Sequence, residues 1–197
     1  MSAKMSVLYV PDTGHAVAAI SRTSDPLVPF DLGRLGGDLV VLKNVNAVTG
    51  GSGKGEEFYI PSGVLKVTNP PIDLNEDLLS TPLNYALDKD VPHQLGKTLP
   101  ANPVTLKPDA LELVSGFSSS AGDLKVWTQV QQKSPIAGND PEIRISTGVI
   151  PKGSGTPTDV PLTGSPGGTP ISLPSGNYYV LVLVAEFPPY FGSGNVP

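Results

Sequence analysis

The stretch Ser172-Leu173-Pro174-Ser175-Gly176-Asn177-Tyr178-Tyr179-Val180-Leu181-Val182-Leu183-Val184 joins a Pro-Ser-Gly turn to the most apolar run of the chain. Pro and Gly favour tight turns, whereas aromatic and β-branched side chains favour strands. A comparable succession of apolar residues and a turn recurs at residues 8–14 and 57–67. Similarity does not extend beyond the turns, so a common turn sequence explains the recurrence better than an internal duplication. The stretch therefore predicts a late strand of an all-β protein.

Glycine and proline punctuate the rest of the chain in the same way. Each occurs 22 times in 197 residues, between short runs rich in Val, Ile, Leu and Tyr. A charged fraction of only 16% argues against disorder, because disordered chains usually combine low hydrophobicity with high net charge. We predict an antiparallel β-sandwich architecture with long Gly/Pro loops. The expected strands are residues 6–10, 15–22, 38–43, 57–60, 64–67, 110–114, 124–130, 142–146 and 179–184.

One of these strands shows a clear alternation of side chains. Residues 124, 126 and 128 are Leu, Val and Thr, and residues 125, 127 and 129 are Lys, Trp and Gln. A period of two places these sets on opposite faces of a strand. The pattern predicts an antiparallel sheet with one face in solvent, on which Trp127 points outward.

The residues Gly176-Asn177-Tyr178-Tyr179 resemble the tyrosine corner of immunoglobulin-like sandwiches. In that motif a Tyr at the start of a late strand donates a hydrogen bond to an upstream backbone group. The resemblance implies an immunoglobulin-like sandwich in the C-terminal half, without an inter-sheet disulfide because the chain has no Cys. A jelly roll produces the same strand signals and remains an alternative.

The length and the texture of the chain indicate two small β domains. Residues 70–103 are rich in Pro and carry leucines at spacings near three and four, which predicts a short helical or extended connector. We therefore expect an N-terminal β domain at residues 1–100 and a C-terminal β-sandwich domain with an aromatic tail at residues 101–197. A Pro-containing loop is expected at Asp25–Pro29 and a flexible Gly-rich loop at Thr49–Gly55, both within the first domain.

Charge and hydrophobicity exclude several classes of partner. The net charge is −5, so a nucleic-acid-binding surface is not expected. The longest apolar run has eight residues, whereas a helix needs roughly 20 to span a bilayer, so no membrane span is expected. The N-terminus lacks the apolar segment of a secretory signal. We expect synthesis in the cytoplasm without a signal peptide, and a place in a virion or phage-like particle.

Motifs for catalysis, cofactors and metals are incomplete. Gly51–Gly55 fails as a phosphate-binding loop because Val48 stands where its first Gly is required and Gly55 stands where a Ser or Thr is required. Asp73–Asp77 begins like a calcium loop, but Leu78 replaces its turn Gly and Asn84 replaces its closing Glu. The second segment is better explained as the start of a helix. His15 and His93 lie far apart in sequence and are expected on the surface or in loops. We predict no catalytic residues, no cofactor and no metal.

Four aromatic residues are the candidates for contact with a partner: Trp127, Phe187, Tyr190 and Phe191. Trp127 is a contact residue if it faces outward, and the alternative is a core Trp between two sheets. The segment Phe187–Phe191 combines three aromatic residues with two prolines outside any evident strand. It is expected to dock against the body of the protein or against a neighbouring subunit.

These observations favour a non-enzymatic structural subunit that builds, decorates or caps a large assembly, such as a phage capsid or tail or a tail-like particle. Its expected partners are other protein subunits, including copies of itself in a homo-oligomer. The alternative is a carbohydrate- or protein-binding β-sandwich module that uses Trp127 and tyrosines such as Tyr178 or Tyr190. A hydrolase is the least favoured hypothesis, because the chain offers only two His.

Overall fold

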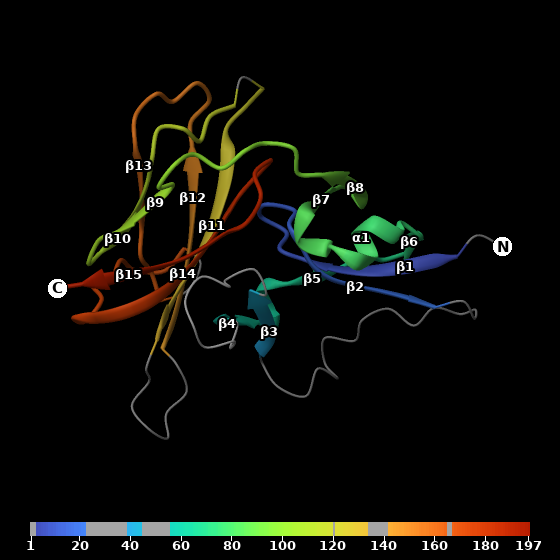
Figure 1. Ribbon diagram of the computed structural model, residues 1–197, viewed down its shortest axis with the longest axis horizontal. Helices are drawn as coiled ribbons and strands as arrows, with labels where there is room; N and C mark the ends of the chain where they lie inside the picture. The colour runs from blue at the N-terminus through green and yellow to red at the C-terminus, as the bar shows by residue number, and fades with distance from the viewer. Residues whose placement is uncertain (1–2, 23–38, 45–55, 120, 134–141, 165–166) are drawn as a thin grey trace. The chain divides into compact units, whose positions relative to one another are not determined.

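The computed structural model divides the chain into two compact units, residues 1–96 and residues 97–197 (Figure 1). It describes residues 3–22, 39–44, 56–119, 121–133, 142–164 and 167–197. The loops predicted at Asp25–Pro29 and Thr49–Gly55 lie outside these ranges. Antiparallel strands dominate both units, so the all-β class is confirmed.

The first unit is organised around the N-terminal hairpin. β1 (Lys4–Tyr9) pairs with β2 (Ala16–Arg22) on one side and with the short strands β5 (Lys66–Val67) and β6 (Ile72–Asp73) on the other. The turn between β1 and β2 needs Gly14, which adopts a left-handed φ of +79°. A Cβ at this position would lie 2.6 Å from the carbonyl oxygen of Leu87. The predicted hairpin is therefore confirmed, and its turn packs closely against a later segment of the unit.

Two further hairpins belong to the first unit. β3 (Leu39–Asn44) pairs with β4 (Glu56–Pro61), and β7 (Tyr85–Asp88) pairs with β8 (Val91–Gln94). The 3₁₀ turn η2 (Ser62–Val64) follows β4, but β4 and β5 pair with different strands. The sequence predicted these two segments as successive strands, and the structure places them in separate sheets.

The segment predicted as a connector contributes to the core of the first unit. α1 (Glu76–Ser80) and the 3₁₀ turn η3 (Pro82–Asn84) precede β7. The Asn75 side chain accepts a hydrogen bond from the Leu78 N–H at 2.9 Å, which caps the helix as its acidic first turn predicts. Leu78 is fully buried and packs in one cluster with Met5 and Val7. Residues 72–94 are therefore a folded part of this unit.

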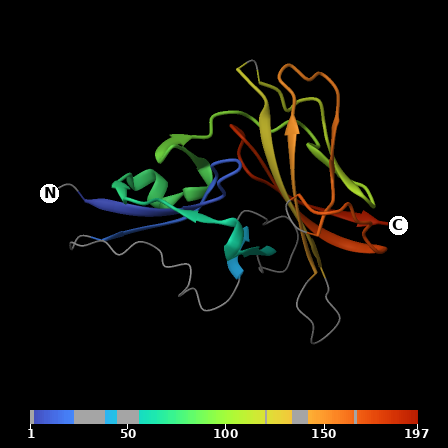
Figure 2. The ribbon, with the colours of Figure 1, turned by 180° about the vertical axis from the view of Figure 1, so that it is seen from behind.

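The second unit is a sandwich of two antiparallel sheets. Its strands are β9 (Val104–Leu106), β10 (Ala110–Leu113), β11 (Leu124–Gln132), β12 (Ile143–Ile150), β13 (Thr158–Pro161), β14 (Gly176–Val184) and β15 (Tyr190–Val196). One sheet has the order β13-β10-β9 and the other β12-β11-β14-β15. Figures 1 and 2 show these two layers from opposite sides. Immunoglobulin-like sandwiches distribute their strands between two sheets in this way, with β12 in the place of the extra strand C′.

The tyrosine corner predicted from the sequence is present. Tyr178 lies in the first part of β14 and is 2% exposed. Its hydroxyl donates a hydrogen bond of 2.8 Å to the carbonyl oxygen of Pro174, four residues upstream. The bond fixes the loop that enters β14 against the strand itself.

The core of the sandwich lies between the two sheets. Its members are mainly aliphatic, as the low aromatic content of the chain predicts. They are Leu111, Leu113, Phe117, Leu124, Val126, Val130, Ile150, Val160, Leu162, Leu173, Tyr178, Val180, Val182, Val184, Phe187 and Val196.

Candidate interaction surface

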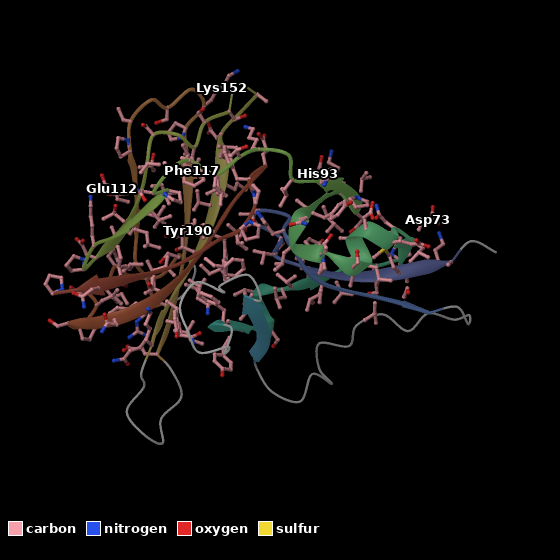
Figure 3. All side chains as sticks on the ribbon, in the orientation of Figure 1. Asp73, His93, Glu112, Phe117, Lys152 and Tyr190 are labelled. Carbon is pink, nitrogen blue, oxygen red and sulfur yellow. The ribbon has the colours of Figure 1, made fainter. Side chains whose placement is uncertain are left out.

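The four aromatic candidates lie on two opposite faces of the sheet β12-β11-β14-β15. Phe187 belongs to the core between the sheets. Tyr190, which is labelled in Figure 3, packs against that core. Trp127 and Phe191 each lie opposite a leucine of β14. Because side chains alternate along a strand, these two residues share the face that points away from the other sheet of the sandwich. The fold therefore separates the four candidates into two pairs.

Phe187 anchors the turn between β14 and β15. Its ring meets Phe117 edge-on, with ring centroids 5.1 Å apart and an interplanar angle of 75°. The Lys97 ammonium lies 4.9 Å from the centroid of the Phe187 ring and 2.6 Å from the Glu186 carboxylate. In the turn, Glu186 adopts a left-handed φ of +73°. The Phe187 N–H donates a 3.0 Å hydrogen bond to the Val184 carbonyl. Phe187 is 3% exposed, so it docks into the body of its own sandwich.

A strand, β15, begins at Tyr190, so the sequence-based expectation that Phe187–Phe191 lies outside any strand is wrong for its last two residues. β15 includes the residues Gly192-Ser193-Gly194, which have low strand propensity. A Cβ at Gly192 would overlap the Tyr190 hydroxyl, and a Cβ at Gly194 would lie 2.7 Å from Cβ of Leu106 on β9. Gly194 therefore lets β15 approach β9 closely, and Gly192 leaves room for the Tyr190 ring of the same strand.

Trp127 is fully buried, with 0% of its surface exposed. The predicted alternation of β11 is present in its register, but the face that carries Trp127 is buried as well, apart from the exposed Lys125. The expectation of a half-solvated face is therefore wrong. Trp127 is buried, as in the alternative, but it lies on the face away from the other sheet and does not belong to the core between the two sheets. The indole Nε1 of Trp127 has no hydrogen-bond partner within the described residues. In this conformation the ring offers no free face to a ligand.

The β12 edge of the four-stranded sheet is partly occupied by side chains and by charge. The Thr163 hydroxyl donates to the Ile145 carbonyl at 2.9 Å, and the Thr163 N–H donates to the Ser146 hydroxyl at 2.8 Å. Arg144, on the same strand, forms an ion pair with Glu142. Charged residues and occupied backbone groups are common protections of an edge strand.

The β15 edge carries no charge. Its seven residues include no charged side chain. Among the described residues, β15 pairs with β14 and with no other strand. Ser193 and Asn195 are exposed, and the two glycines are half-buried. The outward backbone groups of residues 192–196 therefore form an uncharged template to which a further strand can be added.

Side-chain bonds hold this edge strand in register. The Asn195 amide donates to the Gly176 carbonyl and to the Asn177 side chain, both at 3.2 Å. The Ser175 hydroxyl donates to the Pro197 carbonyl at 2.6 Å. Each of these bonds connects β15 back to β14 or to the loop before it. The strand is therefore fixed on its inner side, and none of these bonds occupies its outer side.

Charge is concentrated on the other sheet, in a cluster that joins its three strands. Lys107 follows β9 and lies 2.9 Å from Asp159 on β13 and 3.2 Å from Glu112 on β10. Hydrogen bonds to Asp159 and then Glu112 raise the pKa of the Lys107 ammonium above its ordinary value. These side chains are partly exposed, so the cluster is a cross-strand brace with a small effect on stability.

The two histidines of the chain lie in different surroundings in the first unit. His15 is fully buried, and its Nδ1 lies 2.9 Å from the Thr13 hydroxyl, so the expectation of a surface position is wrong. His93 is exposed on β8, as expected (Figure 3). In the part of the chain that the structure describes, no group of three or more His, Cys, Asp or Glu residues is placed to hold a metal ion.

Comparisons with protein-family models, curated proteins and solved structures find no match to this chain. Among the described residues, no helix combines the length and the apolar character needed to cross a membrane. The functional argument therefore depends on the geometry of the second unit.

Proposed function

We propose that the protein is a non-enzymatic structural subunit that associates with other protein subunits, including its own copies, in a larger assembly. A phage capsid or tail, or a tail-like particle, is the kind of assembly proposed. The observation that carries the proposal is the uncharged edge strand β15, which is held in register on its inner side. Addition of a strand to such an edge is a common mode of protein association.

The packing of the second unit supports this role. Both faces of β11 are largely buried, so its side chains are engaged within the protein. The strand edges and the loops are then the parts of the sandwich that remain for contact with a neighbour. The anchor of Phe187, with its Lys97 and Phe117 contacts, makes the start of β15 rigid. A rigid edge loses little conformational entropy when a partner strand is added.

The alternative of a binding module is retained for protein ligands. Recognition of carbohydrate would need an exposed aromatic ring on which a sugar can stack. Trp127 is 0% exposed, and Tyr178 is 2% exposed with its hydroxyl bonded to Pro174. These burials favour a protein partner over a glycan for the same sandwich.

The proposal is tested by the native mass of the protein, measured by size-exclusion chromatography with light scattering over a hundredfold range of concentration. A structural subunit is expected to form species heavier than the 20.4 kDa chain as the concentration rises. A glycan panel, read through the fluorescence of Trp127, is the contrasting assay. A constant 20.4 kDa species, together with a saturable glycan response, would contradict the proposal.

A further inference from the structure

We propose that Thr163 is an autoinhibitory cap, which occupies the β12 edge of the four-stranded sheet and keeps this edge closed to a further strand. Release of the cap then makes β12 an acceptor for strand addition. The inference goes beyond the proposed function, because it concerns an edge that the chain itself occupies. It is carried by three hydrogen bonds, by the position of Thr163 between the two sheets and by the composition of β12.

Thr163 is held between the two sheets of the sandwich. It follows β13 after one residue, Leu162, which is fully buried. The Leu162 N–H donates to the Asp109 carbonyl at 2.8 Å, and the Leu162 carbonyl accepts from the Ile171 N–H at 2.9 Å. These bonds fix the backbone next to the sheet β13-β10-β9, and Thr163 then reaches the edge strand of the other sheet. A residue anchored to one sheet therefore occupies the edge of the other.

The contact between Thr163 and β12 is a connected set of hydrogen bonds. The Thr163 N–H donates to the Ser146 hydroxyl at 2.8 Å, and the Thr163 hydroxyl donates to the Ile145 carbonyl at 2.9 Å. The two hydroxyl oxygens lie 3.3 Å apart, and Ser146 is the donor between them because the Thr163 proton is directed to Ile145. Thr163 is 8% exposed and Ser146 is 1% exposed, so water has little access to these bonds.

The Ile145 carbonyl is one of the groups that a further strand would use. It accepts from Thr163, so it points away from β11. The direction of the backbone groups alternates along an antiparallel strand, so Ile143, Thr147 and Val149 also turn theirs away from β11. Among the described residues, β12 pairs with β11 and with no other strand. A strand that pairs along this edge must therefore displace Thr163 from Ile145.

The capped part of β12 has the composition of an acceptor strand. The six residues Ile145–Ile150 contain two Ile, one Val and one Thr, and no charged residue or Pro. Short segments with high β-propensity, low charge and no Pro readily add to other strands. Val149 is 51% exposed, so solvent reaches this part of the strand. Arg144 places charge only at the beginning of the strand, and the Thr163 cap protects the part that follows.

The first test locks and releases the cap in one protein. The chain has no Cys, and the Ser146 and Thr163 hydroxyl oxygens lie 3.3 Å apart. In Ser146→Cys/Thr163→Cys the sulfur atoms take these positions, which allows a disulfide. We expect the oxidised variant to keep the native mass of the wild type in light scattering. The reduced variant is expected to form heavier species, because thiols are weak hydrogen-bonding groups. The wild type treated with the same reductant is the control, and its mass should not change.

The second test removes the hydroxyl of the cap. Thr163→Val is expected to raise the association constant of the chain about tenfold over the wild type, since one hydrogen bond changes an equilibrium by about that factor. Thr163→Ser keeps the hydroxyl and should behave as the wild type. The matched control is Thr128→Val, which removes a buried hydroxyl that donates to the Ser146 carbonyl but leaves the β12 edge capped. Trp127 fluorescence verifies that each variant is folded.

The outcomes separate the cap from the proposed function. The cap is overturned if Thr163→Val associates no more than the wild type, or if Thr128→Val associates as strongly, which would assign the effect to lost stability. If Thr163→Val does not fold, equal masses of the oxidised and reduced double variant overturn the cap. A wild type that stays at 20.4 kDa while Thr163→Val associates supports the cap and counts against the proposed function.

Discussion

Removal of one oxygen atom tests the tyrosine corner of the second unit. In Tyr178→Phe the ring keeps its place in the core, and the variant loses only the 2.8 Å hydrogen bond to the Pro174 carbonyl. A typical intramolecular hydrogen bond contributes a net 0.5–1.5 kcal/mol, roughly. Pro174 is exposed, so water can solvate its carbonyl after the change. We therefore expect a loss of about 1 kcal/mol in the free energy of unfolding, below the cost of an unpaired buried group.

The single Trp gives a selective assay for this loss, because Trp127 lies in the second unit. Urea unfolding followed by Trp127 fluorescence should show a midpoint lower by about 0.3–1 M. Thermal unfolding should show a midpoint lower by about 4–8 °C. Tyr85→Phe removes the same atom in the first unit, where the structure gives that hydroxyl no hydrogen bond within the described residues, and should leave the transition unchanged. A Tyr178→Phe transition identical to that of the wild type would refute the structural role of the bond.

The same variant predicts a dependence on pH. Burial raises the pKa of the Tyr178 hydroxyl above its ordinary value near 10, and the nearby Arg144 guanidinium opposes this effect. Because the folded state binds this proton more tightly, the stabilising contribution of Tyr178 is present below about pH 10 and is lost as the pH rises through the folded-state pKa. The difference in stability between wild type and Tyr178→Phe should therefore shrink above pH 10. A difference that stays constant from pH 8 to pH 11 contradicts this assignment.

Three further substitutions probe contacts in both units. Lys97→Met removes the ion pair with Glu186 and the cation–π contact with Phe187, and should destabilise the second unit by about 1 kcal/mol in Trp127-detected unfolding. An unchanged unfolding transition would show that these exposed contacts do not contribute to stability. Gly14→Ala forces a left-handed φ and a Cβ 2.6 Å from the Leu87 carbonyl, so thermal unfolding followed by circular dichroism should show a loss of at least about 1–2 kcal/mol. Asn75→Ala removes a helix cap and should cost about 0.5–2 kcal/mol in the same measurement, whereas Asn75→Asp should retain most of the stability.

Features specified by local sequence were predicted well. The turn before β2 depends on Gly14, and the helix start depends on the Asn75 cap, so a few adjacent residues suffice to identify each. The tyrosine corner could be predicted because its donor and acceptor are four residues apart. In each case the deciding interaction lies within one short segment, where propensity and spacing are informative.

Features specified by packing between distant segments were missed. β15 has weak strand propensity, and its glycines are favourable only because Leu106 and the Tyr190 ring occupy the space beside them. The alternation in β11 indicated which residues share a face with Trp127. It could not indicate whether that face is solvated or buried, because both cases have a period of two. The sequence therefore did not reveal that Trp127 and Phe187 are buried, or that the four aromatic candidates separate into two pairs.

The contrast between the two sheet edges connects the fold to the proposed function. An uncharged edge strand exposes a folded monomer to uncontrolled association, and charge is a simple protection against it. The β12 edge has Arg144 and the Thr163 bonds, so this sheet can carry such protections. At β15 the central exposed residue is Ser193, where a Lys would fit without disturbing the core. The absence of charge at this position is explained if β15 is covered by a second strand in the working state of the protein.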